Sequence, residues 1–250
     1  MSMDISVIIP CYNEAQRIKT TIRRLEEFFV SNTSGTKDFE QVEVICIENG
    51  SSDNTTQVLE ELIKHSPLNM KVLHAPKGKG SAVREGVKQA KYEYVLVMDA
   101  DNATDIKFVS DMVRVLGRNS DIEVDIINSS RRIQGASVAH KQGIMRQVLG
   151  NLFHVFVRKV FNLPVTDSQN GFKLFKTTAA RSLYGRISTT GWVSEIELFL
   201  LAKKQQYIVK EIPVVWNDIS GSTLGVKDIP RISIDLVRLY WRYMVRGDTK

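Results

Sequence analysis

The sequence predicts an α/β protein built on a mostly parallel β-sheet with helices on both faces. Three observations lead to this fold class. Short apolar runs alternate along the chain with amphipathic segments, as they do in βαβ units. The apolar runs lack the polar alternation of half-exposed strands, so helices should cover both of their faces. The 250 residues, 43% of them hydrophobic, also suffice for one large core.

The alternation assigns an expected element to most of the chain. The expected strands are residues 5–10, 42–48, 70–75, 94–98, 123–130, 172–176 and 207–216. The expected helices are residues 14–30, 55–65, 80–90, 139–161 and 193–204, with a last helix from residue 229. We divide the chain into a main domain, residues 1–225, and a C-terminal amphipathic helix, residues 226–250, packed on the domain or on a membrane surface.

The composition of the chain limits the partners and the cellular compartment that we expect for the protein. The formal net charge of +6 indicates anionic partners, which include nucleic acid, phosphate-bearing substrates and anionic membranes. Cys11 and Cys46 lie in or beside apolar runs, as expected for core thiols in a reducing compartment. The four histidines have no metal-ligand spacing and are expected in the surface or the core. With no signal peptide and no run of about 18 apolar residues, we expect a cytoplasmic protein, at most peripheral to a membrane.

Two aspartates at the end of the run 94–98 give the strongest functional signal. Asp99 and Asp101 follow this run and are separated by one residue. Carboxylates at this spacing on a strand point to the same side and repel each other unless a cation lies nearby. A cap for a helix starting near Asp105 is the alternative, but a cap needs one acid at most. Because hard oxygen ligands suit Mg²⁺ or Mn²⁺ bridging a diphosphate, we predict a metal site at Asp99 and Asp101.

Polar segments also follow the other expected strands, where ligands bind in open parallel sheets. The amide of Asn49 suits a nucleobase edge, although Asn49 and Asp53 are also ordinary turn and helix-cap residues. Lys77 and Lys79 flank Gly78 just before a helix, where backbone N–H groups favour an anion. A solvated glycine turn explains these three residues equally well.

Seven segments occur in one order along nearly the whole chain: PCYNEAQRI, ENGSSDNT, KGKGSAVREG, MDAD, SSRR, DSQNGFKLF and WNDISGSTL. In this order the chain resembles glycosyltransferase family 2 and, within it, the dolichyl-phosphate β-glucosyltransferase branch. The resemblance implies a Rossmann-like GT-A fold, a nucleotide-sugar donor, a divalent cation and inversion at the anomeric carbon. The four polar residues before the glycine in DSQNGFKLF are expected to form a wall of the site.

Together with the residues discussed above, the resemblance implies roles for individual side chains. The nucleotide-sugar residues would be Pro10, Tyr12, Glu14, Ile47, Asn49, Asp53, Lys79, Asp99 and Ala100. The metal residues would be Asp101 and Asp99, and the residues for an acceptor phosphate would be Arg131, Arg132, Lys173 and Ser222. The candidate catalytic residues are Asp101, Arg131, Lys173 and Glu195.

The chain departs from the family pattern at two points. The second strand ends in Glu48-Asn49-Gly50-Ser51, where most relatives have Asp-Asp-Gly-Ser, so an amide replaces a carboxylate at the expected base contact. Members of this branch commonly carry membrane-spanning segments, and this sequence contains no apolar run of that length.

We therefore predict a metal-dependent transfer of a hexose to a polyprenyl or dolichyl phosphate, with glucose from UDP-glucose favoured as donor. The alternatives within the family are mannosyl transfer from GDP-mannose and transfer to a carbohydrate hydroxyl. A hydroxyl acceptor needs a general base, for which Asp167, Glu195 and Glu197 are candidates, whereas a phosphate acceptor is already an anion and needs cations.

Two other classes of protein fit the sequence less well. A sugar nucleotidyltransferase should carry a glycine-rich basic loop after the first strand, where this chain has PCYNEAQ. A basic nucleic-acid-binding module would leave the MDAD segment without a role, so we expect no nucleic-acid partner.

The last expected helix is amphipathic. Its apolar face is formed by Ile229, Ile232, Leu236, Leu239, Tyr240 and Tyr243, and a second face carries Arg231, Arg238, Arg242 and Arg246. Burial of the apolar face in the domain is the simplest explanation. The arginine stripe and a lipid substrate favour, in addition, peripheral binding to an anionic membrane surface.

Overall fold

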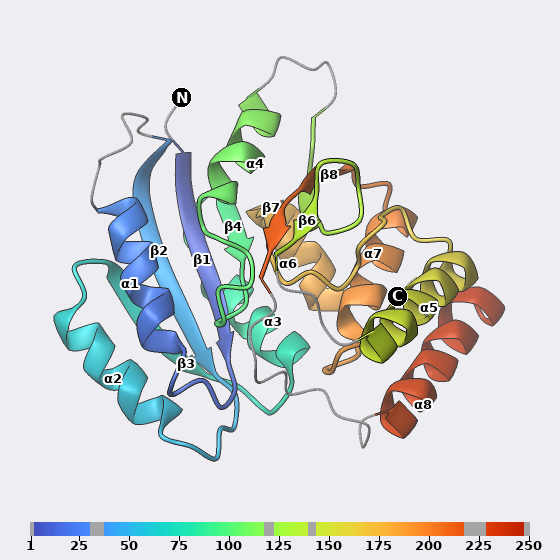
Figure 1. Cartoon of the computed structure of the whole chain (residues 1–250), viewed down its shortest axis with the longest axis horizontal. Helices are drawn as coiled ribbons and strands as arrows, with labels where there is room; N and C mark the ends of the chain where they lie inside the picture. The colour runs from blue at the N-terminus through green and yellow to red at the C-terminus, as the bar shows by residue number, and fades with distance from the viewer. Residues whose placement is uncertain (1–2, 31–37, 118–122, 140–143, 218–228, 248–250) are drawn as a thin grey trace.

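A computed structural model describes residues 3–30, 38–117, 123–139, 144–217 and 229–247. Its centre is a seven-stranded sheet with the strand order β3-β2-β1-β4-β7-β5-β8 (Figure 1). These strands are β1 (Met3–Cys11), β2 (Phe39–Glu48), β3 (Asn69–His74), β4 (Tyr94–Val97), β5 (Ile126–Ser130), β7 (Lys173–Lys176) and β8 (Val209–Pro213). Strand β7 is antiparallel to both of its neighbours, and the other pairs in the sheet are parallel.

Helices cover both faces of the sheet, as the sequence predicts, and the fold class is confirmed. The helices are α1 (Ile18–Phe29), α2 (Thr55–His65), α3 (Lys79–Gln89), α4 (Phe108–Gly117), α5 (Ile144–Phe161), α6 (Thr177–Arg186), α7 (Ser194–Lys204) and α8 (Ile229–Tyr240). Helix α8 continues into a π-helical turn, η2 (Trp241–Val245), and a small second sheet pairs β6 (Ser137–Val138) with β9 (Val215–Trp216).

Two apolar clusters fill the space between the sheet and its helices. Ile8 of β1 lies in the cluster shared with α3, α5, α6, α7 and α8, whereas its neighbours Val7 and Ile9 lie in the cluster shared with α1, α2 and α4. This alternation follows from the two-residue period of a strand. Cys11 and Cys46 are buried free thiols in the second cluster.

Several expected elements differ in extent from those observed, among them one helix and one strand in the second half of the chain. The helix expected at residues 139–161 is α5, which begins at Ile144; residues 140–143 lie outside the described residues, and the short strand β6 precedes them. The expected strand 207–216 is divided into β8 and β9. Pro213, which ends β8, has no backbone N–H for a further ladder bond, and the chain then pairs with β6.

The described part of the C-terminal helix packs on the domain. Leu236, Leu239 and Tyr243 are buried in the same cluster as α5 and α7, and the Phe161 ring contacts the Tyr240 ring at a centroid distance of 6.2 Å. Within the described ranges, no helix has the length and apolarity needed to cross a bilayer.

Close packing of α3 on the sheet yields a test of the fold. A Cβ atom at Gly86 would lie 2.6 Å from Ile8 Cγ2 and 2.7 Å from Ile47 Cδ1. We expect Gly86→Ala to lower the free energy of unfolding by about 1–3 kcal/mol, because the buried side chains of Ile8 and Ile47 would have to shift within a packed core. Denaturant titration measures the change.

Gly185→Ala in α6 is the matched control. A Cβ atom there meets no atom within 4 Å, so this variant should be unchanged or up to about 1 kcal/mol more stable. Equal unfolding midpoints for the two variants would contradict the packing of α3 on β1 and β2.

Candidate active site

The carboxyl ends of β1, β2 and β4 lie at one edge of the sheet, since these strands are parallel neighbours. Strand β7 runs the other way, so its first residue, Lys173, lies at the same edge and pairs with Val97 of β4. The sheet thereby gathers the segments after residues 11, 48 and 97 around the start of β7. This is the edge at which open α/β sheets bind ligands.

Four side chains form a line of alternating charge at this edge. Lys79 Nζ lies 2.7 Å from Asp99 Oδ1 and 2.7 Å from Glu195 Oε1. Lys173 Nζ lies 2.6 Å from Glu195 Oε2 and also donates to the carbonyl oxygen of Asn170. The predicted acid pair therefore has a cation beside it within the protein itself, at the start of α3.

The two aspartates differ in charge environment. Burial alone would raise the pKa of Asp99, but the Lys79 ammonium, with Lys173 and Arg131 further away, holds it below the ordinary value. For Asp101, burial and the negative charge of Asp99 raise the pKa above the ordinary value. Asp101 has no ion pair among the described residues, so it is the member of the pair that a further cation would stabilise.

The donor set around Asp101 fits a divalent cation that is held jointly with a phosphate ligand. Asp101 Oδ1 accepts the Ala103 N–H at 2.9 Å. Glu14 is a further acid affected by this pair: burial, together with the negative charges of Asp101 and Asp99, raises the pKa of Glu14 to about 7. In the described part of the chain, no group of three acidic, histidine or cysteine side chains could hold a metal alone. Mg²⁺ commonly uses only one or two carboxylates and completes its shell with phosphates and water. The residues therefore fit a metal that arrives with a diphosphate.

Gly171 lets the DSQNG segment pass directly against the acid pair. A Cβ atom at this position would lie 1.8 Å from Asp99 Oδ2, which is far inside van der Waals contact. The segment 167–171 thus lines the site beside Asp99, as the sequence predicts for a wall. A hydrogen atom is all that fits between the backbone of residue 171 and the carboxylate.

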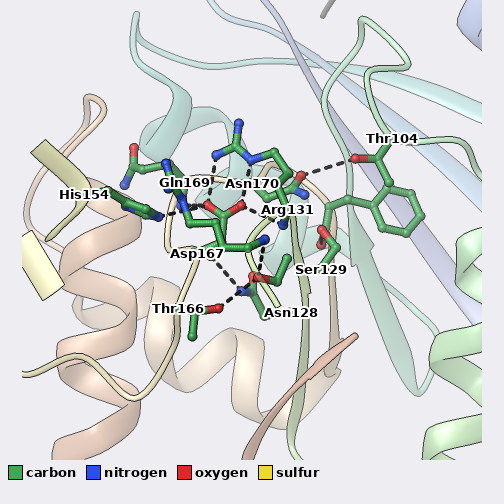
Figure 2. A network of polar contacts seen from close by, with 12 residues as sticks. Thr104, Asn128, Ser129, Arg131, His154, Thr166, Asp167, Gln169 and Asn170 are labelled. Atoms are coloured by element: carbon green, nitrogen blue, oxygen red, sulfur yellow. Dashed lines mark hydrogen bonds and ion pairs between the residues drawn. The ribbon is translucent and has the colours of Figure 1, made fainter. Parts of the chain in front are cut away.

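Arg131 at the end of β5 is held by Asp167 (Figure 2). Its Nε and Nη2 atoms lie 2.6 and 2.9 Å from the two carboxylate oxygens, and its backbone N–H donates to Oδ2 at 3.1 Å. The guanidinium also lies 5.1 Å from the centre of the Trp216 ring. Burial alone would raise the pKa of Asp167, but the bonds from Arg131 hold it far below the ordinary value.

His154 on α5 is a site residue that the sequence analysis did not identify. Its Nε2 atom lies 3.6 Å from Asp167 Oδ1 (Figure 2), and the side chain is buried. Burial, and next the charge of Arg132, lower its pKa to about 4. No spacing in the sequence could reveal this role, because the neighbouring Asp167 is on a different segment. The sequence predicts that each histidine lies either at the surface or in the core, and His154 lies in the interior.

Several buried polar atoms of His154 and of the segment 168–170 have no hydrogen-bond partner among the described residues. They are His154 Nε2, Ser168 Oγ, Gln169 Nε2 and Asn170 Nδ2. Buried polar groups in folded proteins are nearly always bonded, so a cluster of unpaired ones indicates a place for water or ligand atoms. The cluster is part of the same wall of the site.

Asn49 and Ile47, predicted to meet the base, are both buried. With the amide of Asn49 oriented to satisfy both neighbours, its Nδ2 donates to the Cys11 carbonyl at 2.6 Å and its Oδ1 accepts the Gly78 N–H at 3.2 Å. Asn49 thus ties the end of β1 to the turn that carries Lys79. Gly78 has a φ of 133°, which favours glycine, and its Cβ position would lie 2.5 Å from the Thr190 carbonyl oxygen.

The remaining residues predicted to bind the nucleotide sugar also lie at this edge of the sheet. Lys77 Nζ donates to Tyr12 Oη at 2.6 Å, which places Tyr12 beside the same turn. Asp53 accepts the backbone N–H groups of Thr55 and Ala15, so it holds the start of α2. Each of the other two predicted residues has a backbone contact: Pro10 pairs with Ile47 in the sheet and the Ala100 carbonyl accepts Thr21 Oγ1.

Of the residues predicted to bind the acceptor phosphate, Arg132 is described by the structure and Ser222 is not. Arg132 follows Arg131 directly and is exposed, with its backbone N–H donating to Ser130 Oγ at 3.2 Å. Ser222 lies outside the described residues.

The environment of His154 gives a pH-dependent prediction. The native state holds this side chain neutral because its pKa is about 4, whereas in the unfolded chain it has the ordinary value of 6.5. The stability that neutral His154 contributes is complete above pH 6.5 and falls as the pH drops toward 4, by up to about 3 kcal/mol. Asp167, Arg131, Arg132 and Arg158 are the charged groups around it.

The comparison is between wild type and His154→Gln, with the free energy of unfolding measured at pH about 7.5 and about 4.5. Wild type should lose stability relative to the variant toward the lower pH. Glu14, whose raised pKa acts in the opposite direction, contributes equally to both proteins. A difference that stays constant over this range would contradict a neutral, buried His154.

Known proteins share this sequence pattern and this fold. The family model described as Glycosyl transferase family 2 matches residues 6–183. A dolichyl-phosphate beta-glucosyltransferase of Drosophila melanogaster is 32% identical over 251 residues, covering 98% of this chain and 76% of the relative. One from Dictyostelium discoideum is 29% identical over 247 residues, covering 96% of this chain and 75% of the relative.

The fold has solved counterparts. The mannosyltransferase PcManGT from Pyrobaculum calidifontis, in complex with GDP-Man and Mn²⁺, matches with a TM-score of 0.63 at 20% identity, covering 100% of this chain and 66% of that chain. The family match over most of the chain confirms the resemblance that the ordered motifs carry: the protein belongs to glycosyl transferase family 2.

Proposed function

We propose that this protein transfers glucose from UDP-glucose to the phosphate of a polyprenyl or dolichyl lipid, with inversion at the anomeric carbon. The relatives named above are dolichyl-phosphate beta-glucosyltransferases, and they match nearly the whole chain. The site adds an independent argument, which concerns the type of acceptor.

The observation that carries the proposal is that each acid considered as a general base is already held by cations or by hydrogen-bond donors. Asp167 receives the guanidinium of Arg131, and Glu195 lies between two lysines. Glu197 is fully buried and accepts bonds from the backbone N–H groups of residues 188 and 189. Carboxylates held in this way are poor proton acceptors, so the site suits an acceptor that is already an anion.

We assign the donor to the acid pair. Asp101 is the residue assigned to hold a divalent cation, Mg²⁺ or Mn²⁺, with Asp99 beside it and toward the sugar or ribose. When bound, such a cation would offset the charge of the departing diphosphate. Lys79 lies on the same side and supplies a fixed positive charge to the phosphates. Pro10, Tyr12 and Glu14 would line the nucleotide pocket.

The transfer itself needs no proton removed from the acceptor. An acceptor phosphate oxygen forms a bond to C1 of glucose as the bond from C1 to the UDP oxygen breaks. The electron pair of the broken bond stays on the β-phosphate of UDP, and the configuration at C1 inverts. The protein has to position two anions side by side, which is the role we assign to Arg131, Arg132 and Lys173.

The structure distinguishes these three cations by exposure. Lys173 is buried, 1% exposed, behind Glu195, and Arg131 is held by Asp167. Arg132 is exposed and is the one most accessible to an acceptor. Arg131 then fixes the local backbone and adds charge, while Lys173 sets the position of Glu195.

An assay tests the proposal directly. Purified protein is incubated with UDP-glucose, GDP-mannose or other nucleotide sugars, Mg²⁺ or Mn²⁺, and either a short polyprenyl phosphate or the matching polyprenol in neutral detergent. We expect a glucosylated polyprenyl phosphate, detected by mass spectrometry. Preferred use of GDP-mannose would correct the donor, and efficient transfer to the alcohol would move the protein to the hydroxyl-acceptor group.

We expect Asp101→Asn to lower the transfer rate by about 10²-fold or more, because a ligand charge for the cation is removed. The fold should be unaffected or slightly stabilised, since the charge of Asp101 is unfavourable beside Asp99. Asp111→Asn on the exposed part of α4 is the matched control. An active Asp101→Asn protein of normal stability would remove the metal role from this residue.

We also propose peripheral attachment to an anionic membrane surface through α8 and η2. Beside its buried face, this segment exposes apolar residues at helical spacing, namely Ile234, Val237, Trp241, Met244 and Val245. Val237 is 68% exposed and Trp241 55%. Apolar side chains next to arginines are typical of helices that lie in a membrane interface.

Flotation with vesicles checks the attachment. Wild type should float with anionic vesicles at low ionic strength and less so as salt is added, since the Debye length shrinks to about 8 Å at physiological salt. Val237→Ser with Trp241→Ser should reduce flotation, whereas Val30→Ser, an exposed apolar residue after α1, should not. Absence of wild-type flotation at low salt would overturn the attachment.

A further inference from the structure

A polar hollow lies between α8 and the loop before α7. It has a volume of about 300 Å³ and is lined by residues 188–190 and by Arg231, Asp235, Arg238 and Arg242. None of the residues assigned to the donor or the metal lines it. The hollow is therefore distinct from the site at the acid pair.

The hollow has an excess of positive charge. Three arginines face it, against one aspartate, Asp235, which lies 3.6 Å from Arg238. The buried carboxylate of Glu197 is 3.6 Å from Arg242, but it is already bonded to the Ser188 and Thr189 hydroxyls and to Tyr243 Oη. Internal hydrogen bonds thus satisfy Glu197, and Arg242 is engaged with Glu197 and with Ser188 Oγ. The exposed arginines of the hollow, Arg231 and Arg238, are therefore the ones that we assign to an outside anion.

The arginines lie between the two apolar faces of α8. The buried face is formed by Ile232, Leu236 and Leu239, and the exposed face is formed by Ile234, Val237 and Trp241. On a helix with 3.6 residues per turn these two sets fall on opposite sides, and Arg231, Arg238 and Arg242 fall between them. If the exposed face enters a membrane, this stripe lies at the depth of the lipid headgroups.

We propose that this hollow binds the phosphate headgroup of an anionic bilayer lipid, an inference that rests on the membrane attachment proposed above. Arginine forks match phosphate oxygens with two parallel hydrogen bonds, and the hydroxyl-bearing loop 188–190 forms the opposite wall. Since the Gly80 N–H donates to the Thr190 carbonyl at 3.0 Å, a headgroup held here abuts the loop that seats the turn of Lys79.

The test measures binding of the whole protein to vesicles of phosphatidylcholine with and without phosphatidylglycerol. The variants are Arg231→Gln with Arg238→Gln, and Arg231→Lys with Arg238→Lys; both arginines are exposed, so the fold should tolerate them. Arg23→Gln with Arg24→Gln on α1 removes equal charge from another exposed helix surface and is the matched control.

The glutamine pair should weaken binding to the anionic vesicles by about 10-fold or more, since each basic residue near such a surface contributes about 1 kcal/mol. The lysine pair keeps the charge but loses the forks, and should weaken binding by roughly 3-fold or more. The control pair should change binding by less than about 2-fold.

Three results would overturn the headgroup site. If the lysine pair bound the anionic vesicles as tightly as wild type, diffuse charge attraction would explain the binding without a headgroup site. Wild-type binding by the glutamine pair would mean that the hollow is not used. If the glutamine pair had a raised KM for polyprenyl phosphate in neutral detergent but unchanged binding to vesicles, the hollow would be assigned to the acceptor lipid. Glucosyl transfer by wild type in neutral detergent tests the proposed function separately, because no bilayer is present there.

Discussion

The line of charges from Asp99 through Lys79 and Glu195 to Lys173 is the constraint on which the site depends. Each member comes from a different element: the end of β4, the start of α3, the start of α7 and the start of β7. Buried charges are costly unless they are paired, so a shift of α7 or β7 would leave the buried charge of Glu195 or Lys173 without its partner. The same pairing that organises the site therefore fixes two helices relative to the sheet.

Much of the fold could be predicted because its signal is local. Runs such as residues 42–48 and 94–98 are apolar without alternation, and each is followed by a turn and a helix, which is enough to indicate a parallel sheet covered on both faces. The direction of β7 could not be predicted, since a short run such as FKLFK looks the same in either orientation. That reversal brings Lys173 to the edge where the acid pair lies.

The candidate site could be proposed from the sequence where neighbours in sequence are also neighbours in space. Asp99 and Asp101 fall in this group, because two acids directly follow a buried strand. The partners of individual charges were not predictable. Arg131 meets Asp167, 36 residues further along the chain, and Lys79 meets Glu195, and no local pattern announces either pair. His154 was missed for the same reason: its significance comes from Asp167, with which it shares no motif.

The contact between Gly171 and Asp99 limits how this site can diverge during evolution. Since a methyl group at residue 171 would overlap Asp99 Oδ2, every substitution there displaces the carboxylate before it can add a new function. A change of sugar or acceptor must therefore arise at neighbouring positions. Gln169 is one such position, since its amide nitrogen has no hydrogen-bond partner among the described residues. The glycine therefore ties the path of the segment 167–171 to the position of the Asp99 carboxylate.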